Sequence, residues 1–342
     1  MIINGGVIGA NNRPTGNTAN GAVAANTARG VWGWEESTIN RLWNQFPIYV
    51  AAAGGGVFQG STSGYTSGAT PNNNIIDKFP FATNANATDV GDLSQSRGDA
   101  GGQSSTTNGY TSGGSFPGGV SNVIDKFPFA SNANATDVGD LTLARNYTSG
   151  QSSSVSGYTS GGRTPPPSNH ATIDKFPFAS NGNATSVGSL SQARRELTGQ
   201  SSTDNGYASG GTVTGSDDTN VIDKFPFASD ANATDVGDLT VKRWGPAGQS
   251  SSTHGYTSAG ARLNNIDKFP FATDANATDV GDTTIGKYQL AGQSSTASGY
   301  SSAGYNGGGT NVIDKFPFAT NANATDVGDL TLGRYGSTGQ QV

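Results

Sequence analysis

Ile124-Asp125-Lys126-Phe127-Pro128-Phe129 is one of six identical hexapeptides in this chain of 342 residues. Successive copies are separated by 48, 49, 49, 44 and 47 residues, and they place their aspartates at Asp77, Asp125, Asp174, Asp223, Asp267 and Asp314. A Gly-Tyr pair recurs in step with them, with its tyrosine at Tyr65, Tyr110, Tyr158, Tyr207, Tyr256 and Tyr300. A repeat of this length with β-type residues predicts a propeller or a solenoid.

One repeat contains four short strands separated by turn residues. In the third repeat we predict them at 151–154, 158–162, 172–178 and 185–190. Alternation along the third of these strands places Phe176 and Phe178 on one face. Four strands per unit, written six times, predict an all-β protein whose residues 59–342 form a six-bladed β-propeller.

The repeat resembles the kelch motif, in which an aromatic residue precedes a glycine pair and a basic residue follows the fourth strand. Tyr158, Gly161, Gly162 and Arg194 occupy those places. The resemblance implies a kelch-like propeller, although valine replaces the kelch tryptophan of the fourth strand, at Val138, Val187 and Val236. A β-solenoid is the alternative, but six similar repeats without a distinct capping repeat favour a closed ring.

The two ends of the repeat region indicate how the ring closes. The repeats begin in mid-unit at Gly64-Tyr65, and the chain ends in Gly339-Gln-Gln-Val342, which matches the start of the innermost strand in other units. We therefore predict that the C-terminal segment supplies the inner strand of the first blade. Residues 57–60 are the rival candidate for that place.

Alternating strand directions divide the loops between two faces. Turns after the first and third strands form a constant face that is nearly the same in all units, and loops after the second and fourth strands form a variable face. The variable face carries aromatic and arginine residues, which are enriched at binding hot spots. We predict ligand-binding residues at Phe116, Tyr147, Arg163, Arg195, Trp244, Tyr288, Tyr305 and Tyr335. The alternative is that loops simply vary and these rings fill gaps near the axis.

Residues 1–58 differ in composition and predict an extended N-terminal arm. From Ser37 the apolar residues fall at helical spacing until Pro47, which predicts one short helix. Three of the four tryptophans lie in this arm, and aromatic side chains of this number need a surface to pack on. We expect Trp32, Trp34, Ile39, Leu42, Trp43 and Phe46 to dock onto another protein or a sister copy. Packing on the arm's own propeller is the alternative.

Composition argues against several functional classes. The net charge is −6 with no basic run, which disfavours nucleic acid as a partner. There is no cysteine, no apolar stretch of membrane-spanning length and no recognisable signal peptide. His170 and His254 are the only histidines and belong to different units, so a catalytic triad is not expected. We expect no cofactor and no enzymatic activity.

Two repeated charged patterns have structural explanations. Turns such as Asp230-Ala-Asn232-Ala-Thr-Asp235 resemble a calcium loop, but they lack the bidentate glutamate, and Asx hydrogen bonds explain the same residues. We therefore predict no metal site. Asp125, Lys126 and Arg145 suggest an inter-blade ladder of ion pairs, which would contribute little stability at a hydrated surface.

Two stretches resemble virion proteins of tailed phages, notably those of marine cyanobacteria. Gly30-Val-Trp-Gly-Trp-Glu-Glu36, followed by the glycine-rich residues 51–56, looks like an anchor segment, and the repeated phrase beginning Ile-Asp-Lys-Phe-Pro-Phe looks like repeats of tail and fibre proteins. The resemblance implies a non-enzymatic structural protein of the virion, made in the host cytoplasm. Its arm would bind other virion proteins, and its propeller would recognise a host-surface glycan or protein.

Three further functional expectations complete the sequence analysis. The protein would form a homo-oligomer such as a trimer. A capsid decoration or assembly scaffold protein without a receptor role is the first alternative function. A carbohydrate depolymerase is the second, for which Asp217-Asp218 is the single sequence hint.

Overall fold

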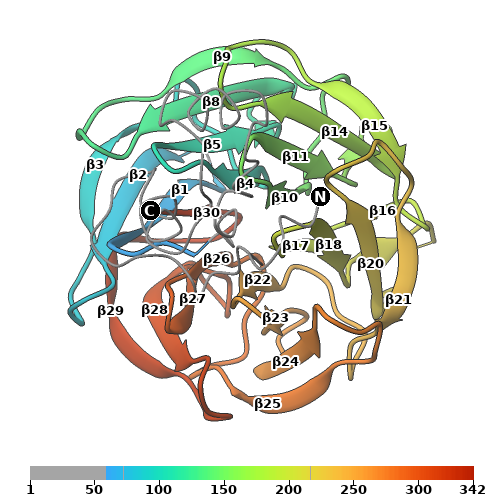
Figure 1. The fold of residues 1–342 in the computed structure, drawn as a ribbon. Helices are drawn as coiled ribbons and strands as arrows, with labels where there is room; N and C mark the ends of the chain where they lie inside the picture. The colour runs from blue at the N-terminus through green and yellow to red at the C-terminus, as the bar shows by residue number, and fades with distance from the viewer. Residues whose placement is uncertain (1–58, 72, 216) are drawn as a thin grey trace, which may run out of the picture. The chain divides into compact units, whose positions relative to one another are not determined.

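The protein's structure is a computed structural model that describes residues 59–71, 73–215 and 217–342. These residues form six four-stranded antiparallel sheets arranged as blades around a central axis, and they contain no helix (Figure 1). The prediction of an all-β, six-bladed propeller is confirmed. The predicted arm and its short helix lie outside the described residues.

The four strands of each blade run in order from the axis outward. From the inner strand to the outer one, the first blade consists of β30 (Thr338–Gln341), β1 (Ser63–Ala69), β2 (Asn73–Pro80) and β3 (Thr88–Asp92). The second blade consists of β4 (Gly101–Ser104), β5 (Asn108–Ser112), β8 (Val123–Pro128) and β9 (Thr136–Asp140). The third blade consists of β10 (Ser149–Ser152), β11 (Ser156–Ser160), β14 (Thr172–Pro177) and β15 (Thr185–Ser189). In the third repeat all four predicted strands are present, and the first begins two residues earlier than expected, at Ser149.

The remaining blades repeat the pattern. The fourth blade consists of β17 (Thr198–Ser201), β18 (Asn205–Ser209), β20 (Val221–Pro226) and β21 (Thr234–Asp238). The fifth blade consists of β22 (Ala247–Ser250), β23 (His254–Ser258), β24 (Asn265–Pro270) and β25 (Thr278–Asp282). The sixth blade consists of β26 (Ala291–Ser294), β27 (Ser298–Ser302), β28 (Thr310–Pro317) and β29 (Thr325–Arg334). Short pairs form on the variable face, namely β6 (Ser115–Phe116) with β7 (Gly119–Val120), β12 (Arg163–Thr164) with β13 (Ser168–Asn169), and β16 (Arg194–Arg195) with β19 (Thr212–Val213).

The C-terminal strand closes the ring, as its sequence match to other inner strands indicated. β30 runs antiparallel to β1, with Gly339 opposite Thr66 and Gln340 opposite Tyr65. The red β30 accordingly lies beside the blue β1 in Figure 1. Of the rival segment, Gly60 instead donates its backbone N–H to Ser294 of the sixth blade, at 2.8 Å. The first blade therefore combines strands from both ends of the propeller.

The repeated aromatic residues form the interface between blades. Tyr110 packs on Phe176 and Phe178 of the next blade, with ring centroids 5.5 and 4.8 Å apart, so both phenylalanines do face one neighbour. A Cβ atom on Gly109 would overlap the Phe127 ring of its own blade. Every blade repeats these contacts. The Gly-Tyr pair and the Phe-Pro-Phe segment are thus two halves of one interface, which explains why they recur in step.

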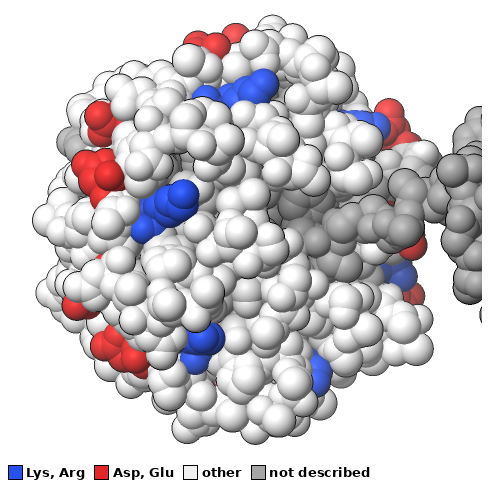
Figure 2. Space-filling model, turned by 60° about the vertical axis from the view of Figure 1, so that its left-hand side comes forward, with Lys and Arg blue, Asp and Glu red and all other residues white. Residues whose placement is uncertain are grey.

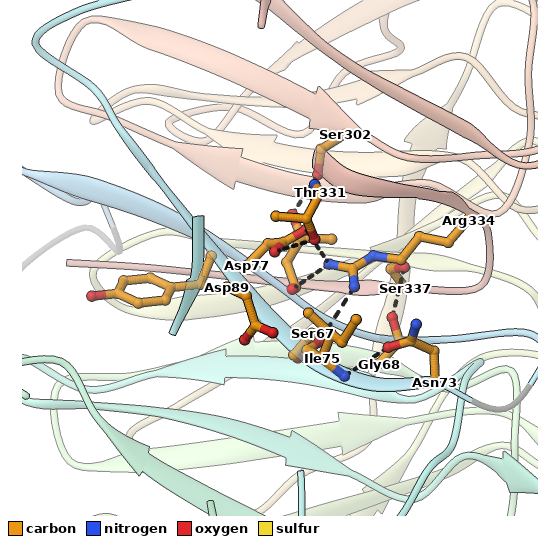
Figure 3. A network of polar contacts seen from close by, with 12 residues as sticks. Ser67, Gly68, Asn73, Ile75, Asp77, Asp89, Ser302, Thr331, Arg334 and Ser337 are labelled. Carbon is orange, nitrogen blue, oxygen red and sulfur yellow. Dashed lines mark hydrogen bonds and ion pairs between the residues drawn. The ribbon is translucent and has the colours of Figure 1, made fainter. Parts of the chain in front are cut away.

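Buried ion pairs form a second repeated contact, and Figure 3 shows the one between Arg334 and Asp77. Arg334 Nη2 lies 3.1 Å from Asp77 Oδ2 and also donates to the Thr66 carbonyl, while Thr331 donates to the same carboxylate. Equivalent pairs, with shortest N–O distances of 2.9 to 3.2 Å and side chains at most 2% exposed, are Arg97–Asp125, Arg145–Asp174, Arg194–Asp223, Arg243–Asp267 and Lys287–Asp314.

The predicted inter-blade ladder of ion pairs is present, but its predicted setting at a hydrated surface was wrong. Asp125 pairs with Arg97, which precedes its blade, whereas Arg145 pairs with Asp174 of the following blade. The reason is that the link after an outer strand crosses to the next blade before that blade's inner strand begins. The pairs are also buried, so removing one partner would leave an uncompensated charge, at a cost of about 3–5 kcal/mol. Lys126 lies outside this network and donates to Asn181 at 3.4 Å.

The inner strands pack almost directly against one another. Gln103 Nε2 donates to the Tyr158 carbonyl of the next blade at 2.9 Å, and the same bond recurs in all six blades. A Cβ atom on Gly150 would overlap the Gly102 carbonyl, and the equivalent glycine of every other blade is similarly placed. Glycine at this position is what allows six strands to converge around a narrow axial channel.

The described chain begins on the constant face. Gln59 Nε2 donates to the Ser295 carbonyl, at 3.0 Å, in the turn between β26 and β27. Figure 2 shows, on the side drawn, separate basic and acidic groups divided by uncharged surface, without a continuous basic patch. No helix in the described residues is long and apolar enough to cross a membrane.

Candidate functional site

One residue of each link between blades adopts a left-handed backbone conformation beside the axis. The φ angles lie between 55° and 65° at Asp99, Tyr147, Glu196, Gly245, Gln289 and Gly336, which we call the mouth ring. Glycine adopts this conformation readily, whereas other residues incur a cost of roughly 1 kcal/mol or more. Four of the six positions nevertheless carry a side chain. All six residues line the axial cavity at the variable face.

Backbone hydrogen bonds join the mouth ring into a closed circle. Tyr147 N donates to the Asp99 carbonyl at 2.7 Å, Glu196 N to Tyr147 at 3.0 Å, and the circle continues until Asp99 N donates to Gly336 at 2.7 Å. Each blade therefore fixes the position of the next residue around the mouth. This rigid circle holds four different side chains at fixed places around a cavity.

The side chains divide the mouth into two unlike halves. Asp99, Tyr147 and Glu196 occupy consecutive ring positions and form a charged half. Gly245, Gln289 and Gly336 occupy the opposite positions, and the residue before each of them is aromatic, namely Trp244, Tyr288 and Tyr335. The pseudo-sixfold propeller thus has an asymmetric opening.

The aromatic half carries a continuous row of rings, which we call the aromatic arc: Trp244, Tyr288, Tyr305 and Tyr335. Successive ring centroids are 4.3, 5.2 and 5.1 Å apart. The loop residue Tyr305 joins the row because its backbone exchanges hydrogen bonds with Tyr288. All four residues are half-buried. Their ring planes are inclined to one another by 53°, 37° and 80°, so the four rings form one contiguous cluster.

In the charged half, Asp99 is a buried carboxylate held by neutral donors. Ser115 Oγ donates to Oδ2 at 2.9 Å, Thr70 Oγ1 to Oδ2 at 3.3 Å, and Gln289 Nε2 to Oδ1 at 3.5 Å. Burial raises the pKa of Asp99 to about 7, Glu196 adds to the shift, and the hydrogen bond from Ser115 opposes it.

The neighbouring groups are perturbed in the same direction. Burial raises the pKa of Tyr147 to about 12, an effect increased by Asp99 and Glu196 and opposed by Arg163 and by a hydrogen bond from Gln289. Burial also raises the pKa of Glu196, against the attraction of Arg195. Perturbed titratable groups clustered in a cavity are a mark of functional sites.

The structure places the eight predicted binding residues in three groups, and all are half-buried. Trp244, Tyr288, Tyr305 and Tyr335 form the aromatic arc. The Arg163 guanidinium lies 4.8 Å from the centroid of the Tyr147 ring, and Arg195 Nε lies 3.9 Å from a Glu196 oxygen. Phe116, in β6, belongs to neither half.

Sequence reasoning missed Asp99, Glu196 and Gln289 as site residues. Each lies two positions after the arginine or lysine that forms the buried ion pair, at Arg97, Arg194 and Lys287. Aligning the six repeats on that basic residue would have placed all three at the same point of the ring. No pattern within a single repeat reveals it.

Other candidate chemistry is dispersed or committed to structure. His170 contacts Thr164 and His254 contacts Thr253, in different blades. Asp218 accepts a hydrogen bond from Thr212 across its own loop. No group of three or more acidic, histidine or cysteine residues suited to a metal ion occurs in the described residues.

The acidic turns make the hydrogen bonds expected of Asx turns. Asp89 Oδ1 accepts from Gly91 N at 3.1 Å, and Asn134 Oδ1 of the next blade accepts from Asp92 N at 3.1 Å. The bond made by the asparagine recurs at all six blade junctions. The repeated Asn-Ala-Thr sequence therefore joins neighbouring blades.

The predicted docking residues Trp32, Trp34, Ile39, Leu42, Trp43 and Phe46 lie outside the described residues. Comparisons with known proteins add no assignment, since no protein-family model and no curated protein sequence matches the chain.

Proposed function

We propose that this protein is a non-enzymatic structural protein of a phage virion, associated with the tail or its fibres. Its N-terminal arm would attach it to other virion proteins, and its propeller would present the variable face to the host surface. The sequence resemblance of the anchor-like segment and of the repeats to phage tail proteins supports the viral part of this proposal. The two-faced propeller supports the recognition part.

The main support for this proposal is that the first described residue and the mouth ring lie on opposite faces of the propeller. Gln59, the first described residue, bonds to a turn on the constant face. The mouth ring and the aromatic arc lie on the variable face. A propeller anchored from the side of Gln59 would hold the mouth ring and the aromatic arc away from the anchor, as an attachment protein requires.

The chemistry of the opening suits a glycan or a protein surface. Half-buried aromatic rings lose little conformational entropy on binding and offer a large contact area. The nearby carboxylates and amides supply hydrogen-bonding groups that orient a polar ligand. The face drawn in Figure 2 has scattered charges without a basic stripe, and the net charge is −6, both of which disfavour nucleic acid as the ligand.

Host adsorption of particles tests this function. We expect the double substitution Trp244→Ala and Tyr288→Ala to lower adsorption by at least about tenfold, because loss of two hot-spot rings typically costs more than about 1.4 kcal/mol. Val155→Ala is the matched control, since Val155 is an exposed apolar residue in a constant-face turn. Incorporation into particles is measured in parallel and should remain normal for both variants.

Normal adsorption by correctly assembled double-variant particles would contradict the receptor role. A role in capsid decoration or as an assembly scaffold would then be the better-supported function. The close contact of the arc rings with one another, with Trp244 and Tyr288 centroids 4.3 Å apart, is the observation that favours that alternative, because rings that pack together also stabilise the fold.

A further inference from the structure

Buried carboxylates in the described chain follow a rule with one exception. Seven aspartates are buried, and six of them pair with an arginine or lysine between blades. The seventh, Asp99, is 8% exposed and has no cationic side chain within ion-pair distance among the described residues. Charges removed from water are normally paired. Among the described residues, Asp99 is therefore the one buried aspartate that has no arginine or lysine in an ion pair with it.

Two cations of the charged half make their close contacts with other residues. The Arg163 guanidinium stacks on Tyr147, and Arg195 faces Glu196. Asp99 receives only neutral donors, from Ser115, Thr70 and Gln289. Its raised pKa, about 7, reflects burial, which the hydrogen bonds from Ser115 and Thr70 and the charge of Arg163 only partly offset.

Asp99 also lines a cavity together with other polar residues. Asp99, Tyr147, Thr148, Glu196 and Gln289 all line the axial cavity at the variable mouth. Glu196 brings a second carboxylate. Thr148 is 7% exposed, and its hydroxyl has no hydrogen-bond partner among the described residues. Two carboxylates and an unused hydroxyl favour a ligand that carries positive charge and several N–H donors.

We propose that this cavity binds the protonated amine of an amine-bearing saccharide, with Asp99 as its counter-ion. The proposal rests on the proposed function, since it names the ligand class of the same face. An ammonium group matches the site better than a divalent metal ion, because the described residues around Asp99 include no third acidic or histidine ligand. The three donors already bound to Asp99 would remain in place.

The saccharide part of the ligand is argued from the position of the aromatic arc. Tyr288 immediately precedes Gln289, whose amide lies 3.5 Å from Asp99 Oδ1. Tyr335 immediately precedes Gly336, where an added Cβ would lie 2.6 Å from the same oxygen. Two rings of the arc thus adjoin the carboxylate through neighbouring residues. A sugar ring stacked on the arc would place an amine substituent at Asp99.

The test measures binding by calorimetry at pH 7 with the full-length chain. The probes are a short oligosaccharide of β-linked glucosamine and its fully N-acetylated counterpart, which has the same rings without the charge. We expect the glucosamine form to bind at least about tenfold more tightly, a difference of about 1.4 kcal/mol, because the N-acetylated form cannot pair a charge with Asp99. Asp99→Asn should remove that preference.

Two further variants provide the controls. Asp217→Asn removes an exposed carboxylate from the same face and should leave the preference intact. Glu196→Gln should weaken the preference, and it keeps the proposal testable if Asp99→Asn folds poorly. Thermal melting of each variant identifies a folding defect.

Four outcomes would overturn the proposal. They are equal affinity for the two oligosaccharides, an unchanged preference in Asp99→Asn, tighter binding of a lysine-containing peptide than of the glucosamine oligosaccharide, and a calcium ion bound in an Asp99-dependent manner. The adsorption test separates the two claims. If Trp244→Ala with Tyr288→Ala abolishes adsorption while the amine preference is absent, the ligand class is wrong and the attachment function stands.

Discussion

At the scale of single residues, Asp99 differs from the six aspartates that form buried ion pairs between blades. The six paired aspartates occur once per blade, and each binds a basic side chain from the preceding blade's outer strand or from the link after it. Asp99 occurs once in the ring, at a position where two other blades have glycine. Its carboxylate is therefore not required by the architecture.

We predict that Asp99→Asn stabilises the protein at neutral pH but not in acid. The folded-state pKa is about 7 and the ordinary value is 3.8, so the folded state binds an extra proton between these values. The stability that Asp99 contributes is present below about pH 4 and is lost as the pH rises through 7. The variant should thus gain up to about 4 kcal/mol over the native protein at pH 8, at about 1.4 kcal/mol per pKa unit.

Chemical denaturation of both proteins at pH 4 and pH 8 measures this difference. Asp217→Asn serves as the control, since an exposed carboxylate should show no comparable change. A constant difference between Asp99→Asn and the native protein at the two pH values would contradict the assignment of Asp99 as an uncompensated buried acid.

At the scale of strands, the inner glycines determine how closely the blades approach. A Cβ atom on Gly199, in β17, would overlap the Gly150 carbonyl of the neighbouring inner strand. Backbone atoms on both sides cannot move without disturbing the Gln200 and Gln151 bonds to the following blades. The position therefore tolerates no side chain without widening the channel.

We predict that Gly199→Ala lowers the free energy of unfolding by at least about 2 kcal/mol, as expected for overpacking against backbone. Gly182→Ala is the matched control, because no atom lies within 4 Å of a Cβ built on Gly182. Denaturant titration of the two variants provides the comparison. Equal stability of Gly199→Ala and the control would show that the inner strands are less tightly packed than the structure indicates.

At the scale of the whole molecule, stability depends on a non-covalent closure. β30 completes the first blade, and Gln340 Nε2 donates to the Tyr110 carbonyl of the second. Without β30, the inner edge of β1 and one side of β4 would lose their neighbours. An unpaired edge also favours aggregation.

We predict that deleting residues 338–342 lowers Tm by at least about 10 °C, because several kcal/mol are lost and each shifts Tm by roughly 2–4 °C in a large domain. A synthetic peptide of residues 335–342 should restore part of the loss in a concentration-dependent way. Calorimetric melting tests both expectations. An unchanged Tm in the deletion would mean that another segment completes the first blade.

The amino-acid sequence alone determined the number of blades, their strands and the identity of the closing strand. These features are encoded by local patterns, namely a repeated hexapeptide, alternating side chains and a C-terminal match to inner strands. Such patterns act within one repeat, so a single sequence displays them six times. The Phe-Pro-Phe and Gly-Tyr segments were predictable as core residues for the same reason.

The tertiary structure alone decided which residues meet across blades. Asp125 pairs with Arg97 rather than Arg145 because the link crosses to the next blade before its inner strand begins. Asp99, Tyr147, Glu196 and Gln289 converge because ring closure brings links from separate repeats to one axis. Residues 190 positions apart, such as Asp99 and Gln289, become neighbours only when six blades close into a circle. The spacing of these residues along the chain does not predict that contact, since the contact forms only when the whole ring closes.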